Sequence, residues 1–260
     1  MRHPAGGAQR PGRPMKAPSP LRRRRAVGPD DPVWLFDLDN TLHDASRGIF
    51  RAIDRRMGAA VAQALDLPQD QADALRLRYW KRYGATAIGL ARHHGVNLRQ
   101  FLATCHDFDI APLVHAETGL AARLRGLPGT RIVLTNAPAH YARRVLDALG
   151  ILQEFDGLWA IDHMMPMGLS RPKPSPGLMR MVVARLGVPA HRIILVEDTE
   201  RNLKSARQAG MRTVWLYHPG TPFSRQRNGR DLYVDARINR LGTLLLRARA
   251  GHMPGSRDRA

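Results

Sequence analysis

The stretch V-W-L-F-D-L-D-N-T-L, residues 33–42, decides the fold of this chain. Its first four residues form an apolar run of the length of a buried strand, and the run stops at Asp37. Asp39 follows two positions later, and side chains two apart on an extended segment point the same way. Open α/β sheets bind ligands at the carboxyl ends of their strands. Because two close carboxylates repel unless a cation or a shared proton relieves them, we expect a divalent-metal site with one acid as nucleophile and the other as acid/base.

Composition limits the classes of protein to consider. The 260 residues are 43% hydrophobic, which is enough for one α/β domain and a smaller one. Cys105 is the single cysteine, so no intrachain disulfide can form, and we expect a protein of a reducing, cytoplasmic compartment. No apolar run approaches the roughly 18 residues of a membrane span, so we expect no membrane partner.

Positive charge is concentrated at the two ends of the chain. The net charge is +19, with eight Lys or Arg against two Asp in residues 1–32 and nine Arg against three Asp in residues 220–260. Proteins that bind single-stranded nucleic acid stack the bases on aromatic side chains. Few aromatic residues lie among these basic ones, which argues against such binding. GC-rich coding explains the general bias toward Arg and Ala more simply, so a basic, nucleic-acid-associated protein is a remote alternative.

The order of the expected elements indicates an α/β fold, a Rossmann-like parallel sheet with helices on both faces, with a small helical cap inserted after the first strand. Residues 46–110 have a helical period of apolar positions and form the cap. Strands and helices alternate over residues 111–220, which complete the catalytic core begun by residues 33–45. Residues 1–32 contain few large apolar residues, so we expect a disordered basic extension. Residues 221–260 are expected to be a second basic extension, partly disordered, with one short helix.

Three further motifs place polar side chains after apolar runs or in a stiff loop. Thr135 ends the run in I-V-L-T-N, where its hydroxyl and the Asn136 amide are suitable phosphate donors. Lys173 lies between two prolines in R-P-K-P-S-P, a rigid loop that can present one ammonium group. Glu197 and Asp198 end the run in I-I-L-V-E-D-T-E-R-N, and paired acids at the tip of a buried strand favour a counter-cation such as magnesium.

Each motif alone has an ordinary structural explanation. The first two acids can be solvated in a turn, Thr135 and Asp198 can cap helices, and Lys173 can be a solvated loop lysine. Together, however, the four motifs resemble those of the haloacid dehalogenase-like phosphohydrolases, whose first motif is D-x-D-x-T, in type and in order over residues 33–215. The second carboxylate, Asp39, argues against the dehalogenases of that family, which lack it.

The resemblance implies catalytic roles for the two acids of the first motif. Asp37 would attack phosphorus and form an aspartyl-phosphate. Asp39 would protonate the leaving oxygen and then activate the water. Magnesium would be bound by Asp37, Asp198 and the backbone carbonyl of Asp39.

The resemblance also implies roles for the other three motifs. Thr135, Asn136 and Lys173 would bind the phosphoryl group. Glu197 would contact the magnesium through water, and Asn202, one helical turn further on, would support the site without being a ligand.

Within the family, the chain more closely resembles the pyrimidine 5'-nucleotidase branch, notably in the segment Y-W-K-R-Y-G-A-T-A-I-G-L-A-R-H-H-G, residues 79–95. That resemblance implies that the cap closes over a nucleoside, although aromatic residues of the cap can also be packing residues. We predict a pyrimidine nucleoside 5'-monophosphate phosphatase, with a phosphoglycolate or sugar-phosphate phosphatase as the alternative. The cap residues predicted to contact the substrate are Tyr79, Trp80, Tyr83, His93 and His94.

Overall fold

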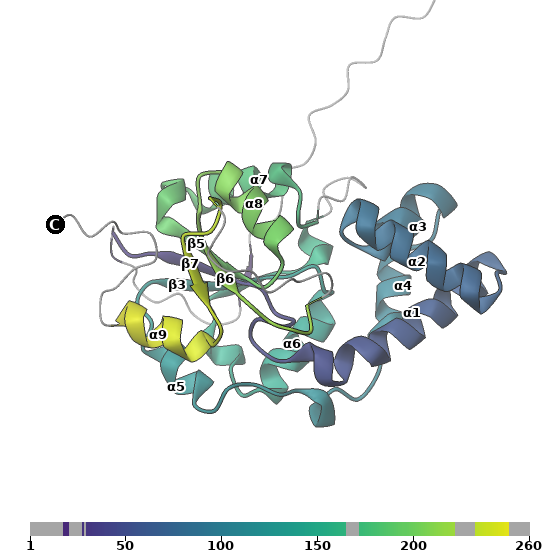
Figure 1. Ribbon diagram of the computed structural model, residues 1–260, viewed down its shortest axis with the longest axis horizontal. Helices are drawn as coiled ribbons and strands as arrows, with labels where there is room; N and C mark the ends of the chain where they lie inside the picture. The colour runs from purple at the N-terminus through teal and green to yellow at the C-terminus, as the bar shows by residue number, and fades with distance from the viewer. Residues whose placement is uncertain (1–17, 21–27, 29, 165–171, 222–231, 250–260) are drawn as a thin grey trace, which may run out of the picture.

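The structure is a computed structural model that describes residues 18–20, 28, 30–164, 172–221 and 232–249. At the centre of the core is a sheet with helices packed around it (Figure 1). It has seven strands in the order β1-β4-β3-β2-β5-β6-β7. Neighbouring strands run parallel except for β1, which is antiparallel to β4. The strands are β1 (Ser19–Pro20), β2 (Val33–Phe36), β3 (Thr130–Leu134), β4 (Gly157–Trp159), β5 (Ile193–Glu197), β6 (Arg212–Leu216) and β7 (Ala236–Ile238).

Strand β2, the apolar run of the first motif, is the central strand. It pairs with β3 on one side and β5 on the other, and Phe36 is in register with Val133 and Val196. Its side chains alternate between the two faces of the sheet, which is why all of them are apolar and buried. The residue after Phe36 therefore leaves the sheet between the ends of two neighbouring strands.

Helices cover both faces of the sheet, as predicted. The helices α5 (Leu120–Arg125), α6 (Ala139–Ala148) and α9 (Leu241–Arg249) pack in one core with Trp34 and Phe36. The helices α7 (Pro176–Leu186) and α8 (Glu200–Gln208) pack on the opposite face with Leu35. This arrangement confirms the predicted α/β, Rossmann-like fold. Short 3-10 helices span Ala45–Arg47, Ala111–Leu113, Leu152–Glu154, Ile161–His163 and Ala190–Arg192.

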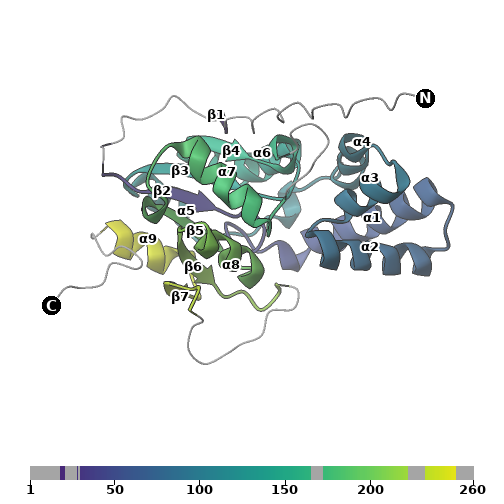
Figure 2. The same cartoon turned by 90° about the horizontal axis from the view of Figure 1, so that it is seen from above.

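The cap is a separate group of helices at one end of the molecule (Figures 1 and 2). It has its own apolar core, to which Val61, Leu75, Leu90 and Phe101 contribute. None of the described helices is both long and apolar enough to cross a membrane. The cap helices are α1 (Ile49–Leu65), α2 (Gln69–Tyr83), α3 (Thr86–His94) and α4 (Leu98–Cys105).

The two ends of the chain differ from the prediction where the structure describes them. Ser19–Pro20 pair with β4 at the sheet edge, although residues 1–32 were expected to be disordered. In the C-terminal segment, β7 extends the sheet and α9 buries an i, i+3, i+4, i+7 stripe against the core. Residues 221–260 are therefore not only an extension, because part of them completes the core. The predictions for residues 1–17 and 250–260 lie outside the described residues.

Candidate active site

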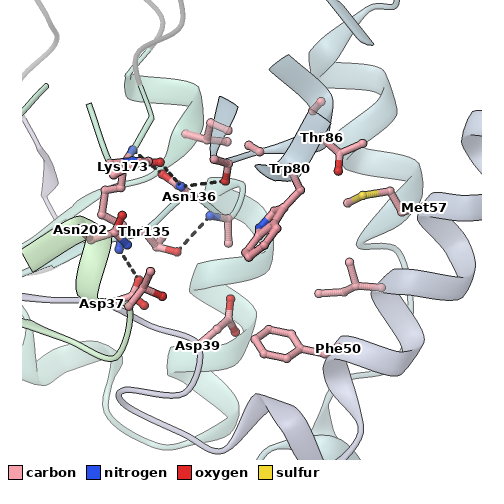
Figure 3. A pocket seen from close by; sticks show the side chains of 18 of the residues that line it. Asp37, Asp39, Phe50, Met57, Trp80, Thr86, Thr135, Asn136, Lys173 and Asn202 are labelled. Atoms are coloured by element: carbon pink, nitrogen blue, oxygen red, sulfur yellow. Dashed lines mark hydrogen bonds and ion pairs between the residues drawn. The ribbon is translucent and has the colours of Figure 1, made fainter. Parts of the chain in front are cut away.

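The predicted motifs meet at the carboxyl edge of the sheet, between the core and the cap. Asp37 follows β2, Thr135 follows β3, Asp198 follows β5, and Lys173 lies in the loop before α7. All four residues line a single cavity of about 450 Å³. Figure 3 shows Asp37, Thr135 and Lys173 on one side of it. Parallel strands end at the same edge of a sheet, so motifs spread over 160 residues of sequence converge there.

Lys173 bridges the two acids on either side of it. Its Nζ lies 2.6 Å from Oδ1 of Asp37 and 2.7 Å from Oε2 of Glu197, and the side chain is only 2% exposed. Burial by itself lowers the pKa of this amine, but the charges of Asp37 and Glu197 more than compensate and raise it. The group therefore stays a cation in direct contact with the predicted nucleophile.

Asn136 anchors the lysine loop. Its Nδ2 donates to the carbonyl oxygen of Lys173 at 2.9 Å, and its Oδ1 accepts from the Lys173 backbone N–H, also at 2.9 Å. The second amide hydrogen is directed to the carbonyl oxygen of Gly84, at 3.4 Å. This differs from the predicted role as a phosphate ligand, because the side-chain amide of Asn136 is already occupied in positioning Lys173.

Thr135 retains a free donor. Its Oγ1 accepts from the backbone N–H of Ala137 at 3.0 Å, and its own N–H donates to the carbonyl of Trp159. The hydroxyl hydrogen is not used in these two contacts, and the residue lines the cavity. Thr135 is therefore placed to donate to an oxygen of a phosphoryl group, as predicted from its position at the strand end.

Three carboxylates form a candidate cation site. Oxygen atoms of Asp37, Glu197 and Asp198 all lie within 4.8 Å of one another. Burial raises the pKa of Asp37 to about 8, of Glu197 to about 7 and of Asp198 to about 6, with mutual repulsion adding to each. The single ammonium of Lys173 cannot balance three negative charges. Hard oxygen ligands around an excess of negative charge fit Mg²⁺.

Glu197, predicted to contact the cation through water, lies in the carboxylate group with Asp37 and Asp198. The Asp39 side chain lies outside that group, and its predicted contribution is the backbone carbonyl. Asp198 is oriented by two hydroxyl donors, Thr199 at 3.2 Å and Thr221. The contact from Thr221 comes from the segment after β6 and could not be found from sequence spacing. Asn202 lines the same cavity, as expected for a residue near the ligands.

Asp39 is held by two residues that the sequence analysis missed. Its Oδ1 accepts from the Tyr141 hydroxyl at 2.7 Å and lies 2.9 Å from Nε2 of His43. Burial opposes ionisation, but the hydrogen bonds and charge of His43 and the hydroxyl of Tyr141 lower the pKa of Asp39 overall. Asp39 lies on the cavity side near Phe50 (Figure 3).

The cap residues require a correction. Of the five predicted to contact substrate, only Trp80 lines the cavity. Tyr79 is buried, stacks on His93 with 5.5 Å between ring centroids, and its hydroxyl is 2.8 Å from His94 Nε2. The Tyr83 hydroxyl lies 2.6 Å from His93 Nε2. Tyr79 and Tyr83 are four apart on α2 and share the face that packs on α3. Tyr79, Tyr83, His93 and His94 therefore stabilise the cap and do not line the cavity.

Comparison with known proteins agrees with the geometry. Residues 33–210 match the haloacid dehalogenase-like hydrolase family, and the chain belongs to that family. A probable phosphatase IndB of Dickeya dadantii is 28% identical over 202 residues, covering 72% of this chain and 83% of the relative. The N-acetylmuramic acid 6-phosphate phosphatase of Pseudomonas aeruginosa is 28% identical over 190 residues, with 69% and 78% covered. A phosphoglycolate phosphatase of Cereibacter sphaeroides is also 28% identical, with 70% and 83% covered.

Solved structures show the same fold. A HAD phosphatase from Thermococcus onnurineus superposes with a TM-score of 0.56 at 20% identity, covering 86% of this chain and 99% of that one. CbbY from Rhodobacter sphaeroides in complex with phosphate gives 0.58 at 18% identity, covering 82% and 96%. The family membership and these relatives support a phosphatase, whereas the predicted pyrimidine 5'-nucleotidase branch is not represented among them.

Proposed function

We propose that this protein is a magnesium-dependent phosphomonoester hydrolase that acts through a phosphorylated Asp37. The observation that carries the proposal is the contact of Lys173 with both Asp37 and Glu197 beside a third buried carboxylate, Asp198. A cationic group against the nucleophile offsets the repulsion between a carboxylate and a phosphate dianion. Bound Mg²⁺ would supply further charge neutralisation for the phosphoryl oxygens.

The chain's own residues account for both halves of the reaction. In the first, an oxygen of Asp37 bonds to phosphorus while the ester P–O bond breaks, and Asp39, in the protonated form that the second half regenerates, gives its proton to the departing alcohol oxygen. In the second, Asp39 takes a proton from water, whose oxygen bonds to phosphorus while the bond to Asp37 breaks. Thr135 and Lys173 donate hydrogen bonds to the phosphoryl oxygens in both halves, which keeps the phosphorus atom in line for attack.

For the substrate, we propose a small phosphorylated metabolite. The relatives named as phosphoglycolate and N-acetylmuramic acid 6-phosphate phosphatases favour the earlier alternative, a phosphoglycolate or sugar-phosphate phosphatase, over the predicted nucleotidase. A pyrimidine nucleotide stays the second candidate because two aromatic side chains, Trp80 and Phe50, line the cavity.

A substrate panel tests the proposal. We would measure kcat/KM for phosphoglycolate, glucose 6-phosphate, UMP and AMP with Mg²⁺ present, and repeat each assay with excess chelator. Phosphate release that depends on Mg²⁺ supports the phosphohydrolase, and the leading substrate selects between the two candidates. No release from any ester, by a protein that melts cooperatively, would refute the proposed activity.

A further inference from the structure

The cavity has two chemically different walls. The core wall carries the acids, Lys173 and the phosphate donor Thr135. The cap wall is largely apolar, and Phe50, Met57 and Trp80 lie on the side away from Lys173 (Figure 3). The apolar side chains of the cap wall are Phe50, Ile53, Met57, Leu77, Trp80 and Leu102. Since the phosphoryl group must lie against Asp37, the departing alcohol faces this apolar wall.

The charged groups of the cap wall neutralise each other. The Arg76 guanidinium lies 2.5 Å from Oδ1 of Asp54, which also lines the cavity, and 3.6 Å from Asp73. His106 uses its Nδ1–H on the carbonyl of Leu102, at 2.8 Å, and burial lowers its pKa to about 4, so its ring is neutral at pH 7. A second anionic group on the substrate would therefore meet an Arg76 whose positive charge is already offset by Asp54 and Asp73, so the net attraction for that group is small.

Among the described residues that line the cavity, the remaining cation is Arg201, at the start of α8. It is exposed and donates to the backbone carbonyl of Lys81 at 3.2 Å, so it connects the core with the cap. Its charge is solvated, which limits what a contact with it can contribute to binding.

We propose that the cap wall binds a neutral leaving group with an apolar ring face, packed on Trp80 and Phe50, and disfavours substrates with a second anionic group. This rests on the proposed phosphohydrolase activity and narrows its substrate. Among small phosphorylated metabolites it favours neutral esters, such as those of an uncharged sugar or ring alcohol, over phosphoglycolate, whose carboxylate is a second anionic group. A cavity of about 450 Å³ has room for a phosphoryl group and a ring system of this kind.

Matched esters test the charge preference. Benzyl phosphate and 4-carboxybenzyl phosphate present the same ring with and without a second charge, and phosphoglycolate presents the charge without the ring. We expect kcat/KM for benzyl phosphate to exceed both others by about tenfold or more. The carboxylate of 4-carboxybenzyl phosphate would lose its hydration against an apolar wall, and phosphoglycolate has no ring to stack on Trp80. Equal or faster turnover of either carboxylated ester overturns the inference and leaves the phosphohydrolase intact. Turnover of none of the three, nor of any ester in the wider panel, refutes both.

Variants of the cap wall test which side chain is responsible for the preference for a ring-bearing ester. Trp80→Ala should raise KM for benzyl phosphate by about tenfold without raising KM for phosphoglycolate, and Trp80→Phe should restore most of the loss. Tyr83→Ala is the matched control, since Tyr83 lies on the same helix but outside the cavity. An unchanged KM in a folded Trp80→Ala protein overturns the assignment; Phe50→Leu provides a second test if Trp80→Ala melts early.

A gain of activity gives an independent readout. Asp54→Asn removes the close partner of Arg76, leaving only the 3.6 Å contact with Asp73. We expect the turnover of 4-carboxybenzyl phosphate to rise several-fold relative to benzyl phosphate. No change in that ratio would show that the Arg76–Asp54 pair does not set the charge preference and would overturn that part of the inference.

Discussion

The hydroxyl of Tyr141, on α6, donates to Oδ1 of Asp39 at 2.7 Å, although the two residues are 102 positions apart. His43 reaches the same oxygen from the other side at 2.9 Å. With Oδ1 occupied by two neighbours, Oδ2 is the oxygen left for the substrate. Tyr141 is therefore a positioning residue, which fixes the rotamer of the proposed acid/base without touching the ester.

Removing that hydroxyl should affect esters according to their leaving group. We expect Tyr141→Phe to lower kcat for an alkyl ester such as benzyl phosphate by about tenfold or more, because a well-placed general acid contributes roughly 10²–10⁴-fold. p-Nitrophenyl phosphate, whose leaving group needs no proton, should lose less, because only the later activation of water by Asp39 is then affected. The check is kcat for both esters in both proteins. An equal loss on both would contradict the role of Tyr141 in orienting Asp39 as the acid.

Asp37→Asn tests the covalent step directly. An amide cannot form the acyl phosphate, so we expect turnover to fall at least about a thousand-fold. Asp147→Asn, on the exposed side of α6, is a control with the same change of charge. The assay is phosphate release under saturating substrate and Mg²⁺. If Asp37→Asn kept more than a tenth of the activity, the nucleophile would have to be another residue.

Metal binding should be linked to pH through the three carboxylates. Their raised pKa values, about 8, 7 and 6, mean that the metal-free native protein keeps protons that the unfolded chain loses near pH 4. The metal-free protein should therefore lose stability as the pH rises from about 4, where the unfolded carboxylates ionise, to about 8, where the last native one does. Mg²⁺ binds the deprotonated form, so its stabilisation should grow over the same range.

Thermal melting measures this linkage without an activity assay. We expect the increase in Tm on adding Mg²⁺ to be about 3 °C or more larger at pH 8.5 than at pH 5.5, which corresponds to roughly 1 kcal/mol in a chain of this size. Asp198→Asn should remove most of the increase, and more of it than Glu197→Gln, since Glu197 is engaged by Lys173. An increase that is the same at both pH values would contradict a site formed by these acids.

The core motifs were predictable because local signals and topology agree. The apolar runs before Asp37, Thr135 and Glu197 are continuous, as strands buried on both faces require, and each stops at a polar residue. Parallel strands then bring those residues to one edge without further information. Lys173 could be found because two prolines mark its loop. The same placement brings the carboxylates of Asp37, Glu197 and Asp198 together.

Contacts between side chains from different elements were not predictable. Nothing in the sequence near Tyr141 or Thr221 indicates that they bond Asp39 and Asp198, since each reaches its partner only after the sheet forms. The direction in which the aromatic side chains of α2 point depends on how α3 packs: Trp80 lines the cavity, whereas Tyr79 packs inside the cap. The apolar stripe of α9 was visible in the sequence, but the Arg-rich composition around it suggested an extension instead.

The junction of cap and lysine loop gives a last, stringent prediction. Gly84 ends α2 with φ of 77°, a left-handed conformation that favours glycine, and its carbonyl accepts from Asn136. A Cβ added there would collide with the carbonyl oxygen of Lys173 and lie 2.8 Å from Cδ of Pro174. The loop that carries the catalytic ammonium would have to shift. Gly84→Ala should therefore impair catalysis as well as stability.

Gly95, at the end of α3, separates the two effects. Its φ is 65°, similar to that of Gly84, but an added Cβ would meet no atom within 4 Å. Both alanine variants should lose about 1 kcal/mol of unfolding free energy from the backbone conformation alone. Only Gly84→Ala should also lower kcat/KM, by about tenfold or more, because a displacement of roughly 1 Å in a catalytic group can cost about 10²-fold. We would measure Tm and kcat/KM for both variants, because Tm reports the shared loss of stability and kcat/KM reports the effect on the lysine loop. Equal kcat/KM for the two would show that the cap junction does not position Lys173.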